Sequence, residues 1–222
     1  MTPTETALCI FVKAPLPGLV KTRLTPLLTT VEAAGLAAAF FADTFALASA
    51  CEWARVVVAC DGDPSPLELA AGTEVWPQGS GDLGERMERV LSRALESSKA
   101  AIVMGTDFPG LPHRFLDSAH LQLSGHDAII GPSADGGFYL LGLQRCPSGL
   151  LRGIPWQSAT TREHTVERLC SVGLRVAEAE PWFDVDVPTD LVRLAGLLRE
   201  ERISAPRTAG FLAGLGPGWR SP

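Results

Sequence analysis

The sequence is poor in several features that mark large classes of protein. Its 222 residues carry a formal net charge of -6, so it lacks the broad basic surface that general nucleic-acid or anionic-membrane binding requires. No apolar run reaches membrane-spanning length, because the alanine-rich segment 31–50 contains Glu32 and Asp43 and is typical of an amphipathic helix. We therefore expect no nucleic acid and no membrane among the partners, and a local cluster of cations for any anionic ligand.

Paired cysteines and a secretory signal are also missing. The chain has no basic start followed by an apolar core and a cleavage site, so we expect no signal peptide. Five scattered cysteines without paired spacing indicate reduced thiols, and predict neither a zinc site nor a disulfide framework. They are Cys9, Cys51, Cys60, Cys146 and Cys170. Together these features favour a cytoplasmic location.

Lysine is scarce too, and its placement is uneven. The chain has three lysines against sixteen arginines, yet Lys13 and Lys21 fall in one loop with Arg23. A lysine is a compact point charge suited to phosphate oxygens, while Pro15 stiffens the loop and Gly18 lets the backbone approach a ligand. The loop predicts a phosphate-binding site, with a solvated basic turn as the alternative.

Apolar strand-like runs alternate with segments of helical period, which is typical of an α/β fold with helices around a parallel sheet. The expected strands lie near residues 7–12, 55–60, 73–76, 101–104, 127–131, 138–143 and 174–177. The expected helices lie near residues 31–51, 83–97, 114–123, 161–172 and 189–200. We predict one domain over residues 1–201 and a loosely ordered tail, rich in Gly, Pro, Arg and Ser, over residues 202–222.

A carboxylate, Asp107, follows the central strand expected near residues 101–104. In open α/β sheets ligands bind outside the carboxyl ends of the strands, so this position faces the expected binding crevice. Taken alone, Asp107 is equally compatible with a turn before Pro109.

A second acid lies in the loop after the strand near residues 127–131, in the order Asp135-Gly136-Gly137, followed by the chain's single tyrosine, Tyr139. A hairpin-type turn would explain Asp135-Gly136 without any function. The acid, the two glycines and the aromatic ring together favour an acceptor site, and we predict that these four residues line it.

A glycine-rich loop after the third strand contains Gln78, Gly81 and Arg86. It matches the dinucleotide fingerprint only weakly, because Asp82 and Glu85 stand where a pyrophosphate would bind and have the pattern of a capping box. We predict that Gln78, Gly81 and Arg86 line part of a nucleotide pocket.

Asp61 and Asp63 stand at alternate positions after the second strand. Asp-Gly-Asp before Pro64 is ordinary turn chemistry, so a turn is the favoured interpretation. Whether either acid contributes to a site stays open.

The last group of acids precedes the final expected helix, where Asp184, Asp186 and Asp190 lie within seven residues. Like charges crowded in this way raise one another's pKa and are costly to bury unpaired, a conflict that a divalent cation removes. Mg²⁺ is typically held by one or two carboxylates together with phosphate oxygens, and Asp107 with Asp186 would supply such a pair. A role for Asp184 stays open.

These motifs resemble, in their order, those of the nucleotide-diphospho-sugar transferase superfamily. The matching segments are the basic first loop, Gly-Thr-Asp107-Phe-Pro-Gly-Leu-Pro, Asp135-Gly-Gly-Phe-Tyr-Leu-Leu-Gly and Phe-Asp184-Val-Asp186-Val-Pro-Thr-Asp-Leu. The chain is more closely similar to a bacterial branch of glycosyltransferases, some associated by name with arsenosugar biosynthesis. It is more distantly similar to the guanylyltransferases of molybdenum cofactor and phospholactate metabolism.

The resemblance covers about residues 7–198 and implies a single-domain, Rossmann-like three-layer sandwich of the glycosyltransferase A type with a mostly parallel sheet. Asp107 and Asp186 match the superfamily's metal-binding acids, which implies Mg²⁺ or Mn²⁺ as the cofactor. Lys13, Lys21 and Arg23 match the basic loop that binds triphosphate in the related guanylyltransferases. That loop has prolines where the molybdenum-cofactor enzymes have glycines, so the resemblance implies no preference for a base.

We therefore expect a metal-dependent transferase with a nucleotide-activated donor and a small acceptor. In the first alternative an acceptor hydroxyl attacks a nucleotide-sugar, with Asp135 as the base or acceptor-positioning group. In the second, a nucleotidyltransferase releases pyrophosphate. Two other classes stay open: a P-loop-like kinase or ATPase built on Lys21-Thr22, although Val20 stands where that motif needs glycine, and a non-catalytic nucleotide-binding module.

Overall fold

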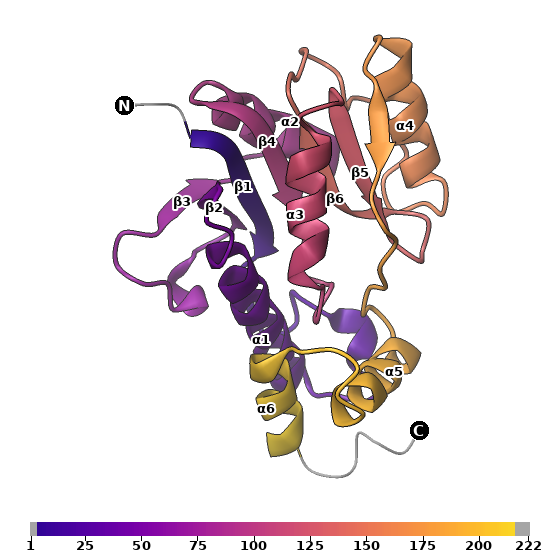
Figure 1. Ribbon diagram of the computed structural model, residues 1–222. Helices are drawn as coiled ribbons and strands as arrows, with labels where there is room; N and C mark the ends of the chain where they lie inside the picture. Colours follow the sequence, from indigo (N-terminus) through magenta and orange to yellow (C-terminus); the bar gives the residue numbers. More distant parts are fainter. Residues whose placement is uncertain (1–3, 216–222) are drawn as a thin grey trace.

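One sheet forms the centre of the computed structural model, which describes residues 4–215. Within that range seven strands lie in the order β3-β2-β1-β4-β6-β5-β7 (Figure 1). β6 runs antiparallel to β4 and β5, and the other neighbouring strands are parallel. The strands are β1 (Thr4–Lys13), β2 (Ala54–Asp61), β3 (Glu74–Pro77), β4 (Ser98–Met104), β5 (Ala128–Pro132), β6 (Phe138–Leu143) and β7 (Val176–Glu178). The mostly parallel sheet predicted from the sequence is confirmed.

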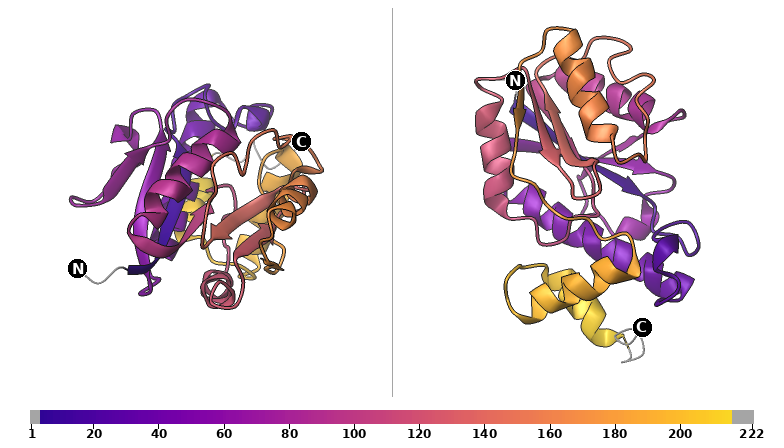
Figure 2. Two further views of the ribbon diagram at one scale, coloured as in Figure 1. Left: turned by 90° about the horizontal axis from the view of Figure 1, so that it is seen from above. Right: turned by 90° about the vertical axis from the view of Figure 1, so that its right-hand side faces the viewer.

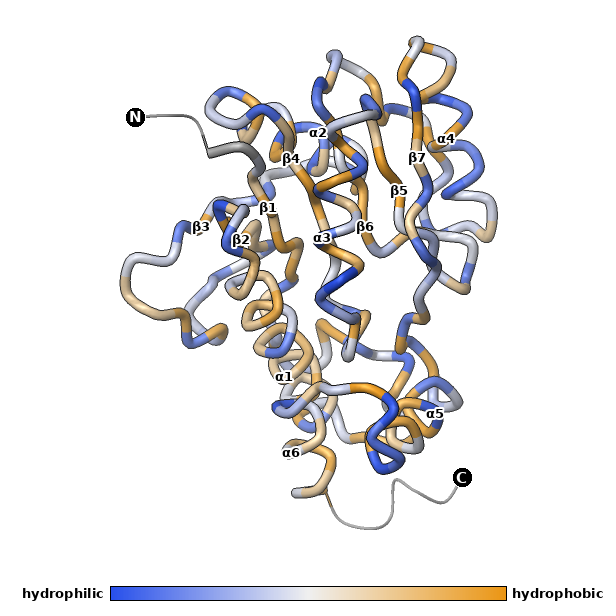
Figure 3. The backbone as a smooth tube through the Cα atoms, in the orientation of Figure 1, coloured by the Kyte–Doolittle hydropathy of each residue, from blue (hydrophilic) through white to orange (hydrophobic). Residues whose placement is uncertain are grey.

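Helices cover both faces of this sheet, which gives the three layers seen in Figures 1 and 2. Side chains of α1 and α3 pack with Ile102 on one face, and side chains of α2 and α4 pack with Val103 on the other. Ile102 and Val103 are neighbours in β4 and are 0% and 3% exposed. β4 is therefore buried on both faces, and its sequence is apolar throughout this part (Figure 3). The helices are α1 (Thr30–Ser49), α2 (Leu83–Leu95), α3 (His113–Gln122), α4 (Thr161–Ser171), α5 (Pro188–Arg199) and α6 (Pro206–Gly214), with short 3₁₀ helices η1 (Thr22–Leu24) and η2 (Ser65–Leu67).

Helix α1 is long and apolar, and one face of it is buried in the core. It begins at a capping box, in which Glu32 N donates to Thr29 Oγ1 and Thr29 N donates to Glu32 Oε2. Its length and hydropathy would be sufficient for a membrane span. In this fold Phe40 and Phe41 are 0% and 2% exposed and pack in the core, which accounts for the composition.

Each strand and helix expected from the sequence is present to within a few residues, but the expected tail is wrong over residues 206–214. These residues form α6, which packs on α1 so closely that a side chain at Gly35 would meet the Phe211 ring. The carboxylate of Asp43 in α1 accepts hydrogen bonds from Arg207 N and from Thr208 N and Oγ1 at the start of α6. Residues 216–222 of the expected tail lie outside the described residues.

Candidate active site

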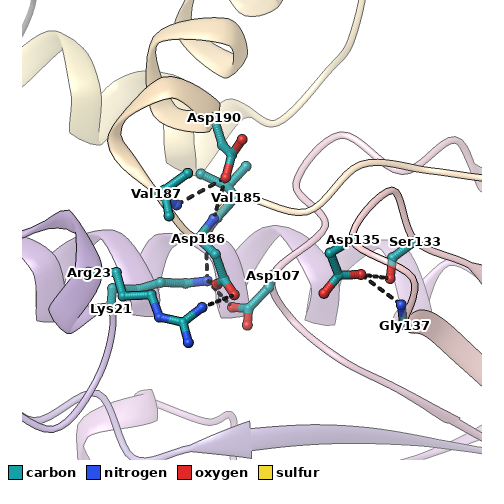
Figure 4. Close-up of polar contacts among 10 residues, drawn as sticks. All are labelled: Lys21, Arg23, Asp107, Ser133, Asp135, Gly137, Val185, Asp186, Val187 and Asp190. Carbon is teal, nitrogen blue, oxygen red and sulfur yellow. Dashed lines mark hydrogen bonds and ion pairs between the residues drawn. The ribbon is translucent and has the colours of Figure 1, made fainter. Parts of the chain in front are cut away.

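Three loops meet at the carboxyl ends of β1 and β4. The first follows β1 and carries Lys21, the second follows β4 and carries Asp107, and the third leads into α5 and carries Asp186. Val185 N donates to Asp107 O at 3.0 Å, so a backbone hydrogen bond joins the second and third loops. Asp107 and Asp186, 79 positions apart in the chain, are thereby placed side by side (Figure 4). We call these two residues the aspartate pair.

The ammonium group of Lys21 lies between the two carboxylates (Figure 4). Lys21 Nζ is 2.6 Å from Asp107 Oδ1 and 2.9 Å from Asp186 Oδ1, and it donates to Val185 O at 2.8 Å. Both carboxylates are therefore within reach of one cation, which is the arrangement predicted for the aspartate pair. The metal-binding role itself remains a prediction.

Lys21 is held in an unusual conformation. Its backbone is in the left-handed region, with φ 47° and ψ 35°, which is uncommon for a residue other than glycine. Its side chain is 6% exposed, whereas those of Asp107 and Asp186 are 46% and 39% exposed. Burial is the largest single influence and lowers the pKa of Lys21, but the two carboxylates together outweigh it and raise the pKa above its ordinary value. The ammonium group is therefore charged at neutral pH.

The other acids near α5 have different partners. Asp190 Oδ2 accepts from Asp186 N and Val187 N, so Asp190 caps the helix and orients Asp186. Asp184 is half-buried, and burial followed by the charge of Asp135 raises its pKa to about 6. Arg23 Nη1 is 4.0 Å from Asp186 Oδ2 and is 69% exposed, so it adds positive charge at the rim of the site.

The remaining predicted residues of the first loop lie at the same edge of the sheet. Lys13 is exposed at the end of β1, Pro15 is buried, and Gly18 has φ +78° with open space around it. Lys21 precedes the single turn of η1 and not an α-helix. A P-loop requires a glycine-rich turn at the start of an α-helix, so the structure argues against that alternative.

In Figure 4 Asp135 is drawn apart from the aspartate pair, and its contacts there are within its own loop. Its Oδ1 accepts from Gly137 N at 2.9 Å and from the hydroxyl of Ser133. Gly136 has φ +88°, and a Cβ at this position would lie 2.0 Å from Ala159 O. The loop therefore requires glycine at this position, and it presents Asp135 in a fixed orientation.

Tyr139 does not fit its predicted role as an acceptor contact. Its side chain is 1% exposed and packs between Phe108 and Phe115, and its hydroxyl donates to Glu180 O at 3.0 Å. The residue belongs to β6, a strand buried on both faces, so its ring is not available to a substrate.

Gln78, Gly81 and Arg86, predicted to line a nucleotide pocket, form a network at the ends of β2 and α2. Gln78 Nε2 donates to backbone oxygens of β1 and β2, and its side chain is 4% exposed, so it holds the two strand ends together. Arg86 donates through Nη1 to Asp61 Oδ2 at 2.9 Å and through Nε to Gly81 O at 3.0 Å. Arg86 therefore neutralises Asp61 at the edge of the first loop.

The predicted turn and capping patterns in this region agree with the structure. Asp63 Oδ1 accepts from Ser65 N and Oγ, so the second acid after β2 serves its own turn. Asp82 and Glu85 form a capping box at the start of α2.

The structure brings together a second group of side chains of types that bind metals, Cys51, His113 and Asp117. The sequence did not indicate this group, because the cysteine spacing alone gives no signal. We call it the thiol cluster; its ligand atoms lie within 4.8 Å of one another. Cys51 Sγ is 3.5 Å from His113 Nε2, His113 Nδ1 is 2.9 Å from Asp117 Oδ2, and Trp53 Nε1 donates to Asp117 Oδ1. The one local signal was the His113–Asp117 spacing, which places both on one face of a helix.

Comparison with solved structures supports the class of fold. Over 94% of each chain, the protein superposes on a proposed nucleotide-diphospho-sugar transferase from Desulfovibrio desulfuricans G20, with 31% identity and a TM-score of 0.84. It shares the fold of CMP:2-keto-3-deoxy-manno-octonic acid synthetase complexed with CTP (13% identity, 89% and 99% of the two chains, TM-score 0.58). The same holds for Rv0371c of Mycobacterium tuberculosis H37Rv in complex with manganese (20% identity, 86% and 98%, TM-score 0.52).

The fold and the resemblance carried by its motifs place the protein in the nucleotide-diphospho-sugar transferase superfamily. Residues 37–158 match the family described as uncharacterized protein conserved in bacteria (DUF2064), and the chain belongs to that family. A search of curated proteins found no significant match.

Proposed function

We propose that the protein is a divalent-metal-dependent transferase that moves a glycosyl group from a nucleotide-sugar to a small acceptor. The observation that supports this most is the convergence of Asp107 and Asp186 on one cation position. Carboxylate oxygens are the ligands that Mg²⁺ and Mn²⁺ prefer, so the donor set fits such an ion. About two fifths of each side chain is exposed, which leaves room for a donor phosphate beside the metal.

The aspartate pair and the polar residues around it have distinct roles in this reaction. When bound, the metal would neutralise donor phosphate oxygens and stabilise the charge that develops on the leaving nucleotide. Lys13 and Arg23, which are exposed at the same edge of the sheet, would bind the outer phosphate oxygens. Asp135, fixed by Ser133 and Gly137, would orient the acceptor hydroxyl or accept its proton.

Transfer of a nucleotidyl group is the second candidate, and the exposed cations of the first loop favour it. In that reaction an acceptor phosphate or carboxylate attacks the α-phosphorus and pyrophosphate leaves, so more negative charge must be neutralised. Glycosyl transfer ranks first because the relative that is 31% identical is a proposed nucleotide-diphospho-sugar transferase.

Calorimetry with a panel of nucleoside triphosphates and nucleotide-sugars, each with and without Mn²⁺, tests the proposal. A nucleotide-sugar should bind best, and only with Mn²⁺, in the wild-type protein and in the control variant Asp63→Asn, whose altered acid serves its own turn. Analysis of the products with the best donor then separates the candidates, because glycosyl transfer releases a nucleoside diphosphate and nucleotidyl transfer releases pyrophosphate. Binding without turnover against a broad acceptor panel would favour the non-catalytic alternative.

A further inference from the structure

The ammonium group of Lys21 has no hydrogen-bonding capacity left in this structure. An ammonium group has three protons, and here three acceptors surround it: Asp107 Oδ1, Asp186 Oδ1 and Val185 O, at 2.6, 2.9 and 2.8 Å. The side chain is 6% exposed. In this position Lys21 cannot also bind a donor phosphate.

The same ammonium group lies where the proposed metal would lie. A Mg²⁺ ion is about 2.0–2.1 Å from its ligand oxygens, so an ion shared by Asp107 and Asp186 would take the oxygens that now contact Lys21. Two cations on the same oxygens would repel each other strongly at this distance. Lys21 and the divalent ion are therefore alternatives at one position.

We propose that Lys21 is a displaceable internal cation. It holds the aspartate pair together before the metal binds, competes with the metal for both carboxylates, and moves to a donor phosphate when the metal enters. This inference rests on the proposed function, because it takes Asp107 and Asp186 as the metal ligands. Displacement of Lys21 makes the binding of metal and donor cooperative, since the donor offers new acceptors to the displaced ammonium group.

The local structure is suited to such an exchange. The carboxylates of the aspartate pair are 46% and 39% exposed, so an ion can approach them from solvent while Lys21 is still in place. The left-handed backbone of Lys21 is unfavourable for a residue with a side chain, and the contacts of its ammonium group help to hold it. Once those contacts are lost, the loop before η1 is released to a more favourable conformation.

The first test is the affinity for Mn²⁺ without any donor, measured by calorimetry on the wild-type protein and on Lys21→Met. If Lys21 occupies the carboxylates in about nine tenths of the molecules, its removal strengthens Mn²⁺ binding about tenfold. Two variants control for charge. Arg23→Met removes a cation 4.0 Å from Asp186 that does not occupy the ion position, and Lys99→Met removes one at the opposite end of β4 from Asp107.

We expect a smaller gain for Arg23→Met than for Lys21→Met, because its charge lies 4.0 Å from Asp186 but is 69% exposed and weakened by water, and less than about a twofold gain for Lys99→Met. Unchanged or weaker Mn²⁺ binding by Lys21→Met would overturn the proposal, and so would an equal gain in Arg23→Met. Asp186→Asn separates this result from the proposed function. If Asp186→Asn loses Mn²⁺ binding while Lys21→Met gains none, only the displaceable cation is refuted, whereas unchanged binding in Asp186→Asn refutes both.

A second test uses the wild-type protein and so does not depend on the folding of a variant. The amines are acylated with and without saturating Mn²⁺, and peptide mass spectrometry gives the rate at each of the three lysines. Lys21 should react slowly without Mn²⁺ and several-fold faster with it, relative to Lys99. A constant Lys21 rate at Mn²⁺ saturation contradicts displacement.

Discussion

The thiol cluster and the aspartate pair both contain side chains that bind metals, but their charges are balanced differently. In the thiol cluster His113 lies between Cys51 and Asp117, and Asp117 also accepts a hydrogen bond from Trp53. Burial, followed by the charge of Asp117, raises the pKa of Cys51 to about 11, so the thiol keeps its proton near neutral pH. The thiol cluster is a chain of hydrogen bonds that is satisfied without an ion.

The aspartate pair has more negative charge than its surroundings compensate. Two carboxylates share the single ammonium group of Lys21, and Arg23 is too exposed and too distant to neutralise the second charge fully. The comparison shows that close spacing of Cys, His and Asp side chains is by itself a weak indication of a metal site. Uncompensated charge that is open to solvent is the stronger indication.

The largest effect that separates the two clusters is expected in catalysis. Asp107→Ala and Asp186→Ala should each lower turnover of the best donor about 100- to 1,000-fold, since loss of one preorganised charge contact typically costs about 3 to 4 kcal/mol of barrier. Asp117→Asn, which removes the carboxylate charge of the thiol cluster, should retain turnover within about threefold, because its amide oxygen still accepts from Trp53. Equal losses in both clusters would remove the distinction between them.

A substitution in the loop that carries Asp135 should have a smaller effect, first on stability and then on turnover. Gly136→Ala places a Cβ 2.0 Å from Ala159 O at φ +88°, so the loop must move, and we expect about 3 kcal/mol of lost stability. Gly153→Ala is the control, because its φ of +74° carries strain but the space around it is open, and about 1 kcal/mol is expected. Urea unfolding measures both.

If Asp135 serves the acceptor, Gly136→Ala should also lower turnover while leaving Mn²⁺ affinity unchanged. A drop in Mn²⁺ affinity would instead show that the loop supports the metal site. Full activity in a folded Gly136→Ala variant would contradict the acceptor role of Asp135.

The sequence predicted the central sheet from local patterns, and it predicted the aspartate pair from the acid after a central strand, the crowded acids before the last helix and the resemblance of both segments to family motifs. Strands buried on both faces are continuous apolar runs, and acids placed after parallel strands gather at one edge. The position of Lys21 was not predictable in this way. It depends on a left-handed backbone at a residue other than glycine and on three acceptors from distant segments.

The features that the sequence failed to predict have a common physical cause. In each of them, long-range contacts override the local composition. The segment 206–214 has the composition of a tail, yet Asp43, more than 160 positions earlier, caps it as α6. Tyr139 follows an acid and two glycines, yet β6 buries it between other strands. Cys51 meets His113 across 62 positions, so no spacing rule indicates the thiol cluster.

The smallest predicted effect concerns the hydrogen bond from Trp53 to Asp117. That bond is the largest cause that lowers the pKa of Asp117, with burial opposing it and His113 adding to it. A carboxyl group with a lowered pKa stabilises the fold above its unfolded pKa, near 4, and the stabilisation is lost as the pH falls through the folded value. Trp53→Phe should therefore cost about 1 kcal/mol more at pH 7 than at pH 3, since Asp117 is 44% exposed and water weakens the bond.

Urea unfolding at several pH values measures this difference. The lost stacking of Trp53 on His120 adds a further cost that does not involve the charge of Asp117. In an Asp117→Asn background the part that depends on the charge of Asp117 should vanish and the stacking cost should remain, because the amide carries no titrating charge. A cost of Trp53→Phe that does not vary with pH would mean that the charge of Asp117 is balanced elsewhere. The thiol cluster would then resemble the aspartate pair more closely than its hydrogen bonds indicate.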